Sequence, residues 1–334
     1  MFVIRLVVIS LLMAPPLARA EECVPYNKAS HKLIEIRPGY YTIKGDLARF
    51  DPCNSTVSLQ MPSLFSEKIS EKPPVFLIVH GGGGLGSNEK NLASALNSEG
   101  IAALVFDAYK MNGYVTKEEH ALFLTGASNE ARQRMIYKVS LGAYRWLKNN
   151  EKVDTSRIFI FGISNGATVA VNLAAAVDVK HVRAVIAEGT TSLGLGLPHT
   201  INVPTRLVVG KLDNYGGASE NDLIFTRTGP CYVNVLFRLA PPGTSETCSQ
   251  QANPHDTSIS PQTWFKNLKA SGKDIDVWFY DDAAHGIMAG PIDRGVRIYG
   301  TGPTAKKRFG WTGSDSDAKE KFIADLKAFV KSTY

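Results

Sequence analysis

Short apolar runs constrain the fold of this chain more than any other sequence feature. Each run lacks the alternation of polar and apolar residues that a half-exposed strand shows, so each is typical of a strand buried on both faces of a sheet. The runs occupy residues 75–79, 101–106, 157–161, 182–187, 205–209 and 276–280. Strands of this kind need layers of other structure on both sides.

Segments with helical patterning lie between the runs. Residues 130–149 carry an apolar stripe through Met135, Val139, Ala143 and Trp146, with basic residues elsewhere. The other predicted helices are 88–97, 165–176, 261–270 and 317–330. Strands that alternate with helices predict an α/β fold with a mostly parallel sheet, helices on both faces and right-handed crossovers. Such sheets bind ligands at the carboxyl ends of their strands.

The first 20 residues, MFVIRLVVISLLMAPPLARA, are typical of a secretory signal peptide. Arg5 precedes an apolar run that is too short to cross a bilayer, and Ala18-Arg19-Ala20 resembles a cleavage site. An uncleaved anchor is the weaker alternative because Pro15 and Pro16 break the run. We therefore expect residues 1–20 to be removed, the mature chain to be periplasmic or secreted, and no integral membrane span.

Residues 21–334 are expected to form one domain, because no low-complexity linker, repeat or charge block divides them. The net charge of +6 falls to +4 when the two arginines of the leader are removed, a value too small to indicate nucleic-acid binding. Nothing in the sequence indicates the oligomeric state.

Four cysteines form two local pairs, Cys23 with Cys53 and Cys231 with Cys248. We predict two disulfides, because an exported chain with an even cysteine count favours them and these pairings close the shortest loops. A metal site is the weaker alternative, since no metal-ligand spacing is present. The first disulfide would hold an N-terminal arm (21–70) with extended segments at 32–36 and 57–60. The second would hold an insertion near 214–261, either as a wall of the pocket or as a surface loop.

The segment FGISNGA at 161–167 places Ser164 between two glycines. A G-x-S-x-G match occurs by chance in many proteins, so an ordinary loop hydroxyl is the alternative. Here a predicted strand precedes the serine and a predicted helix follows it, the context of a nucleophile on a strained turn. Side chains at Gly162 and Gly166 would collide with the neighbouring strand and helix. The backbone N–H of Asn165 is then expected to form half of an oxyanion hole.

A serine hydroxyl needs a base to remove its proton and a carboxylate to orient that base. His285 follows the last apolar run and is the predicted base, with a surface-loop histidine as the alternative. Asp213 is the predicted acid. Asp281 and Asp282 are its rivals, but they lie close to His285 in sequence. The chain order Ser164, Asp213, His285 matches the order that this fold class uses.

The second glycine-rich stretch, HGGGG at 80–84, closes the first apolar run. Backbone N–H groups in such a loop can approach a developing oxyanion closely. We predict that Gly82 and Gly83 supply the other half of the oxyanion hole, without deciding which amide is used. A phosphate cradle is disfavoured because no Lys-Ser/Thr follows. His80 is expected to orient this loop rather than to transfer a proton.

Taken together, these motifs resemble the α/β-hydrolase superfamily and, within it, the dienelactone-hydrolase-like family. The resemblance spans most of residues 70–334 and is carried by HGGGG at 80–84, FDAYKMNGY at 106–114, VDTSRIFIFGISNGA at 153–167, VGKLD at 209–213 and YDDAAHG at 280–286. It implies an eight-stranded, mostly parallel sheet, the Ser-Asp-His triad and hydrolysis of small esters or lactones. Dienelactone hydrolases proper use a cysteine nucleophile, so this chain is similar to a serine variant.

The sequence therefore predicts an exported serine hydrolase that acts on a small-molecule carboxylic ester and needs neither a metal nor an organic cofactor. A peptidase, amidase or acyltransferase would use the same triad on another bond. A catalytically silent binding protein on the same scaffold is the alternative from a different class.

Overall fold

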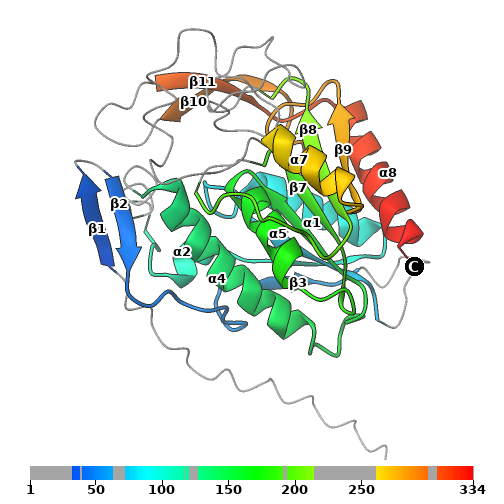
Figure 1. Cartoon of the computed structure of the whole chain (residues 1–334), viewed down its shortest axis with the longest axis horizontal. Coiled ribbons are helices and arrows are strands. Elements are labelled where there is room, and N and C mark those ends of the chain that lie inside the picture. Colours follow the sequence, from blue (N-terminus) through cyan, green and yellow to red (C-terminus); the bar gives the residue numbers. More distant parts are fainter. Residues whose placement is uncertain are drawn as a thin grey trace, which may run out of the picture.

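A seven-stranded sheet forms the centre of the molecule (Figure 1), in the order β3-β5-β4-β6-β7-β8-β9. The computed structural model describes residues 32–37, 40–62, 72–116, 118–119, 127–190, 194–213, 261–299 and 307–333. β3 runs antiparallel to β5, and the other neighbours are parallel. The strands are β3 (Ser58–Gln60), β4 (Val75–Val79), β5 (Ala102–Val105), β6 (Ile158–Ile163), β7 (Val182–Glu188), β8 (Thr205–Gly210) and β9 (Ile275–Tyr280).

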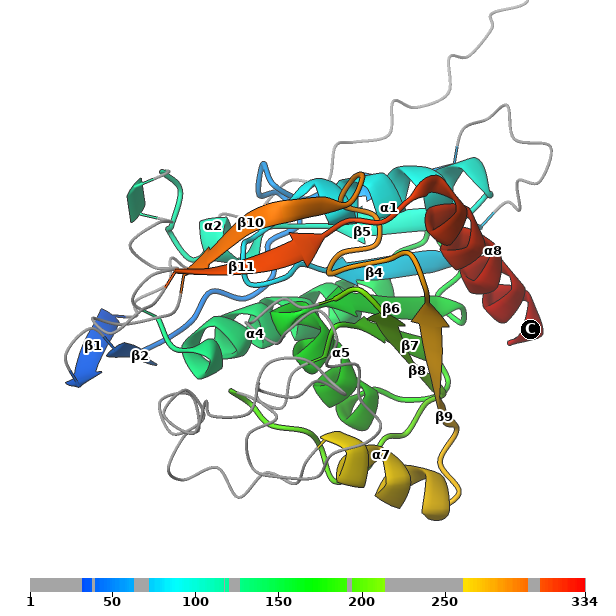
Figure 2. The same cartoon turned by 90° about the horizontal axis from the view of Figure 1, so that it is seen from above.

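Helices cover both faces of the sheet, as Figure 2 shows: α1 and α8 lie on one side, and α4, α5 and α7 on the other. The helices are α1 (Ser87–Ser98), α2 (Ala108–Met111), α4 (Asn129–Leu147), α5 (Asn165–Ala176), α7 (Pro261–Ala270) and α8 (Ser316–Ser332). The predicted fold class and every predicted strand and helix of the core are confirmed. The sheet has seven strands within the described ranges, where eight were expected.

Side chains of the central strands alternate between two hydrophobic clusters. In β4, Val75, Leu77 and Val79 face the cluster under α4 and α5, whereas Phe76 and Ile78 face the cluster under α1 and α8. All five are fully buried. This double burial explains why the strand sequences are continuously apolar.

Side-chain caps define where two of the long helices begin. Ser128 Oγ accepts the N–H of Ala131 at the start of α4, and Asp315 accepts the N–H of Ala318 at the start of α8. Each cap satisfies a backbone donor that has no partner within its own helix. α4 then buries Met135, as its apolar stripe predicts.

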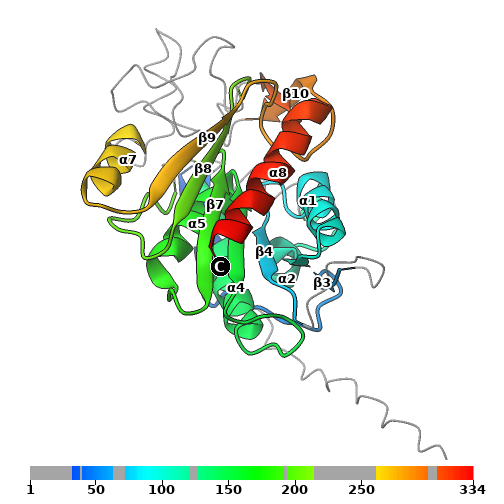
Figure 3. The ribbon, with the colours of Figure 1, turned by 90° about the vertical axis from the view of Figure 1, so that its right-hand side faces the viewer.

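The chain changes direction in the sheet at β4. After β4 it adds β5 on one side and then returns to add β6 on the other side (Figure 2). The strands β7, β8 and β9 follow in turn (Figure 3). The carboxyl ends of β4 and β6 therefore diverge at a topological switch point, where open α/β sheets place their ligands. His80 follows β4 there and Ser164 follows β6.

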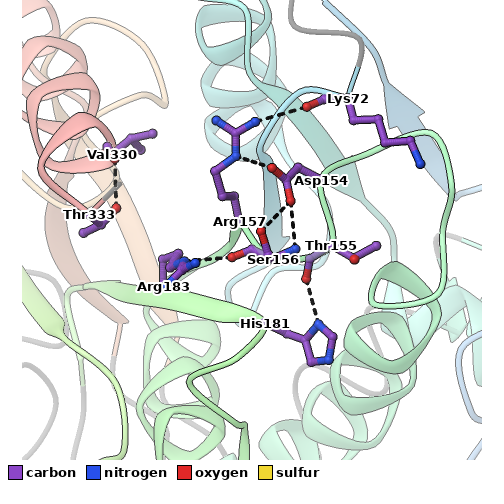
Figure 4. A network of polar contacts seen from close by, with 9 residues as sticks. All are labelled: Lys72, Asp154, Thr155, Ser156, Arg157, His181, Arg183, Val330 and Thr333. Atoms are coloured by element: carbon purple, nitrogen blue, oxygen red, sulfur yellow. Dashed lines mark hydrogen bonds and ion pairs between the residues drawn. The ribbon is translucent and has the colours of Figure 1, made fainter.

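A polar network joins the loops at the opposite, amino-terminal end of the strands (Figure 4). Asp154 pairs with Arg157, and the guanidinium also donates to the carbonyl of Lys72. The ring of His181 bonds the carbonyl of Thr155 at 2.8 Å. Together these contacts tie the turn before β6 to the segments that lead into β4 and β7. This network is remote from Ser164 and serves as a structural clamp.

Two antiparallel hairpins accompany the sheet. β1 (Lys32–Arg37) pairs with β2 (Tyr40–Lys44), and β10 (Asp293–Tyr299) pairs with β11 (Lys307–Thr312). The first confirms the extended segment expected at 32–36, while the second was not foreseen. In Figure 1 the second hairpin crosses the top of the molecule, at the end of the sheet where the strands point.

Several sequence predictions fall outside the described residues. These are the leader at 1–20, residues 214–260 of the expected insertion, and Cys23, Cys231 and Cys248. Cys53 is disulfide-bonded, and its partner must be one of those three cysteines, so the pairing with Cys23 stays a prediction. Among the helices in the described ranges, none has the length and apolar character needed to cross a membrane.

Candidate active site

Ser164 occupies a strained turn between β6 and α5. Its φ of 56° is the one positive value among non-glycine residues in the described part of the chain. The backbone is fixed from both sides, because the Ser164 N–H donates to the carbonyl of Glu188 at 2.8 Å and the Ser164 carbonyl accepts the N–H of Ala167 at 2.9 Å. The side chain makes no capping hydrogen bond to α5. The strain is held by its surroundings, and the hydroxyl stands at the positive end of the helix dipole.

The two glycines that flank Ser164 are required by close backbone approaches. A Cβ at Gly162 would lie 2.2 Å from the carbonyl oxygen of Gly166, inside the first turn of α5. A Cβ at Gly166 would lie 2.4 Å from the carbonyl oxygen of His80, just beyond β4. These contacts confirm the collisions expected from the sequence. Because these two positions carry no side chain, α5 packs directly against β6 and against the end of β4.

Asp213 and His285, two members of the predicted triad, lie in direct contact. His285 Nδ1 lies 3.0 Å from Asp213 Oδ2, and the side chains are only 9% and 2% exposed. Asp213 follows β8, where its N–H donates to Gly210 and the preceding Leu212 N–H donates to Ala283. These bonds fasten the acid loop to the histidine loop, so the carboxylate reaches the imidazole from a neighbouring strand end.

The rival acids do not face the imidazole. Asp281 pairs with Lys211, and both Asp281 and Asp282 are exposed. Asp282 takes part in the fold through its carbonyl, which accepts the N–H of Asp315. The structure thus brings Asp213, rather than either rival, to His285.

The imidazole of His285 lies beside Gly189, at the end of β7. Glu188 binds the Ser164 N–H through its carbonyl, and the next residue, Gly189, has a φ of 61°. A Cβ at Gly189 would lie 2.9 Å from His285 Cε1 and 3.6 Å from Asp213 Oδ2. Gly189 therefore leaves the space that the imidazole and its carboxylate partner occupy beside the serine turn. The sequence analysis did not recognise this role.

The HGGGG loop lies next to Ser164 and is fixed by buried polar groups. A Cβ at Gly81 would lie 3.6 Å from Ser164 Cβ. Both ring nitrogens of buried His80 contact backbone groups, with the Gly81 carbonyl at 2.8 Å and the Ala108 N–H at 3.0 Å, which fits the predicted orienting role. The Gly81 N–H donates to Glu89 Oε1 at 3.2 Å. That amide is thus engaged, whereas Gly82 and Gly83 are the next amides along the loop.

The side chain of Asn165 connects this loop to α4. A Cβ at Gly82 would lie 2.6 Å from Asn165 Nδ2, and Asn165 Oδ1 accepts a hydrogen bond of 2.9 Å from Gln133. Gln133 is fully buried and also accepts the Leu195 N–H at 2.8 Å. Gln133 thus positions Asn165, a role that no local sequence motif signals.

Tyr109, considered as a possible pocket wall, is fully buried and packs its ring against His80 with centroids 4.9 Å apart. Burial raises the pKa of its phenol above the usual value. Tyr109 is therefore a packing residue. Within the described ranges, no cluster of three or more His, Cys, Asp or Glu side chains is arranged to hold a metal ion.

Glu188 is a further residue that the sequence analysis missed. It ends β7, is 2% exposed, and accepts the N–H of Ile287 at 2.6 Å through Oε1. Burial raises the pKa of its carboxyl to about 7, against the opposing effects of the Ile287 hydrogen bond and His285. An acidic residue directly after an apolar run was the available signal, because ligands and catalytic groups collect at that strand end.

The fold is that of an α/β-hydrolase: helices cover a mostly parallel sheet, and a strained serine turn lies at the switch point. The model of the dienelactone hydrolase family matches residues 62–229, half of the chain. The matched range includes Ser164 and Asp213 and ends before His285. The chain belongs to the dienelactone hydrolase family and is a hydrolase of that family.

Solved structures to which this chain is similar have low sequence identity to it. Dienelactone hydrolase from Anabaena variabilis is 17% identical, with 78% of this chain and 89% of that chain covered and a TM-score of 0.41. Est1E from Butyrivibrio proteoclasticus is 14% identical, with 91% and 98% covered and a TM-score of 0.43. The esterase Pf2001 from Pyrococcus furiosus is 14% identical, with 86% and 97% covered and a TM-score of 0.44. A comparison with curated proteins gave no match.

Proposed function

We propose that this protein is an exported serine hydrolase that cleaves small carboxylic esters or lactones through an acyl-enzyme on Ser164. The observation that carries the proposal is the Asp213–His285 pair, 3.0 Å apart and buried beside the strained turn of Ser164. A serine with a positive φ, next to a histidine that a carboxylate orients, is the arrangement that nucleophilic acyl transfer requires.

His285 acts first as the general base. Its Nδ1–H donates to Asp213, which leaves Nε2 free of a proton and able to take one from the Ser164 hydroxyl. The serine oxygen attacks the ester carbonyl carbon as this proton moves to Nε2. Asp213 stabilises the imidazolium that forms. The imidazolium then returns the proton to the departing alkoxide, and the alcohol leaves.

Backbone amides stabilise the negative charge that develops on the carbonyl oxygen. The Asn165 N–H at the start of α5 and an N–H of Gly82 or Gly83 are the proposed donors. The bond from the Gly81 N–H to Glu89 supports the assignment, because it engages the preceding amide and fixes the loop. Loss of one such donor costs about 3–4 kcal/mol of transition-state stabilisation in related sites.

Water completes the cycle by the same sequence of proton transfers. His285 removes a proton from water, the hydroxide attacks the acyl carbon, and the proton returns to the oxygen of Ser164 as the acid leaves. Every proton taken up is released, and hydrolysis changes no oxidation state, so the chemistry needs no redox partner. A lactone would open by the same steps and leave as a hydroxy acid.

The leader-like first 20 residues and the even number of cysteines support export to the periplasm or the medium. We propose that residues 21–334 form one catalytic domain with an N-terminal arm held by the Cys23–Cys53 disulfide. The segment near 214–261, with the Cys231–Cys248 pair, follows Asp213 directly and is proposed as a wall of the substrate pocket.

Replacing His285 by alanine tests the proposed general base. We expect kcat for short-chain p-nitrophenyl esters to fall by roughly 10⁴-fold or more, because the serine proton then has no acceptor. His181→Ala is the matched control, since His181 lies in the clamp at the opposite end of the sheet. It should retain turnover. Equal losses in both folded variants would contradict the role given to His285.

A further inference from the structure

The backbone around His285 is held both by backbone bonds and by side chains from elsewhere in the fold. The His285 N–H donates to the carbonyl of Trp311 at 3.2 Å, and the His285 carbonyl accepts the N–H of Gly313 at 3.0 Å. Gly286, with a φ of 78°, follows the histidine and interrupts regular structure. The Ile287 N–H donates to Glu188 Oε1 at 2.6 Å, and the Met288 N–H donates to Asn88 Oδ1 at 2.8 Å. Ser314 Oγ donates to the carbonyl of Ile287 at 2.8 Å. The loop that follows the histidine is thus held by a few buried polar side chains.

Glu188 differs from the other groups in this set because it can ionise. Its Oε2 is buried and has no hydrogen-bond partner among the described residues. An ionised carboxylate with one unsatisfied buried oxygen is unfavourable, whereas a protonated carboxyl at the same place leaves no charge to solvate. The Ile287 N–H can bond Oε1 in either state, so the carboxyl can hold the loop whether or not it is charged.

Charged and titratable groups surround Glu188 on each packed element. His285 favours the ionised carboxyl, whereas Asp213 and Glu89 oppose it, and all three act more weakly than burial. The charge of Glu188 also contributes to the raised pKa of the Tyr280 phenol on β9. Because the attraction between Glu188 and His285 is mutual, an ionised Glu188 also favours the imidazolium.

We propose that Glu188 is a positioning residue for His285 that also couples the activity of the site to pH. The proposal rests on the function proposed above and adds a regulatory group to it. Through the Ile287 N–H, Glu188 holds the imidazole over the serine turn. Its negative charge stabilises the imidazolium, both when His285 takes the serine proton and when His285 is protonated by solvent.

Glu188→Gln separates the two effects, because glutamine keeps an oxygen for the Ile287 N–H but cannot ionise. We expect the acidic limb of the kcat/KM profile for a p-nitrophenyl ester to move by about one pH unit to lower pH. On the alkaline plateau kcat should fall by about tenfold, since the imidazolium formed in the transition state loses a stabilising charge. KM should change little.

Two further variants distinguish charge from position. Glu188→Ala removes both the charge and the hydrogen bond to the Ile287 N–H. It should lower kcat by about 100-fold, because the imidazole is no longer held in position toward Ser164. Asn88→Ala removes the adjacent loop contact without changing a charge, so it should lower kcat and leave the acidic limb in place. If the role of Glu188 were purely structural, Glu188→Gln would keep the hydrogen bond, retain a wild-type kcat and leave the acidic limb in place.

Thermal unfolding supplies a readout that does not require activity. The carboxyl has a raised pKa in the folded protein, so its stabilising effect is complete below about pH 4.5, the ordinary value, and is lost as pH rises through about 7. The Tm of Glu188→Gln relative to wild type should therefore be higher at pH 8.5 than at pH 5.

An acidic limb that stays in place in Glu188→Gln, or a relative Tm that does not rise with pH, would overturn the coupling. Retention of turnover by Ser164→Ala would instead refute the proposed function, and the unfolding measurement would still report on Glu188. The failure of one idea can therefore be told from the failure of the other.

Discussion

Substituting Ser164 by alanine is expected to lower kcat for short-chain p-nitrophenyl esters by roughly 10⁴- to 10⁶-fold. The hydroxyl is the only group proposed to form a bond with the substrate, so its loss removes the acyl-enzyme route altogether. The residual rate would come from substrate binding and the oxyanion donors. Alanine keeps the strained backbone conformation with its φ of 56°, so the fold should be retained.

Ser98→Ala provides the matched control for this measurement. Ser98 is an exposed serine that ends α1, where its hydroxyl donates to the carbonyl of Ala95. Its kinetic constants should match those of the wild type, and circular dichroism should show both variants folded. Undiminished turnover by folded Ser164→Ala would mean that another group performs the chemistry.

Gly166→Ala is expected to have the largest effect on stability. The new Cβ would lie 2.4 Å from the carbonyl oxygen of His80 and 2.5 Å from that of Val79, and neither backbone atom can rotate away. Alanine normally stabilises a helix by about 1 kcal/mol relative to glycine. Here overpacking should exceed that gain and reduce the free energy of unfolding by about 3 kcal/mol or more.

Chemical denaturation of Gly166→Ala and of Gly83→Ala measures this difference. Gly83 is the matched control for stability, because a Cβ there would meet no heavy atom within 4 Å. Its denaturation midpoint should remain close to that of the wild type, whatever happens to its activity. A Gly166→Ala variant as stable as the wild type would show that α5 does not pack against β4 as closely as the structure indicates.

The core of the fold could be predicted because its signals are local. A strand buried on both faces must be apolar along its whole length, and the run at 75–79 shows this directly. The stripe through Met135 likewise marks the face of α4 that packs on the sheet. The expected eighth strand came from the family resemblance alone, and no apolar run in the sequence indicated it. The described sheet has seven strands.

The candidate triad was predictable for a similar reason. A G-x-S-x-G turn, an acid and a histidine each follow a buried strand, and parallel strands bring their carboxyl ends to one edge. The sequence alone left three aspartates open as the acid. The choice depends on three-dimensional packing, since the Asp213–His285 contact joins residues 72 positions apart.

The roles of the supporting residues were not predictable, because they depend on partners distant in the chain. Glu188 bonds an amide 99 positions away, and Asn88 bonds one 200 positions away. Neither residue stands in a motif with a known spacing. Gly189 is not part of a recognisable sequence motif either. Its role is clear only from the structure, where the imidazole of His285 occupies the space that a Cβ at Gly189 would need.

Active-site labelling tests the central claim most directly. The purified protein would be treated with a fluorophosphonate, which reacts with an activated serine hydroxyl, and digested for mass spectrometry. We predict a single adduct on Ser164, loss of esterase activity in proportion to labelling, and greatly slowed labelling of His285→Ala. An unlabelled Ser164 in a protein that hydrolyses esters, or an adduct on another residue that accounts for the inhibition, would contradict the account.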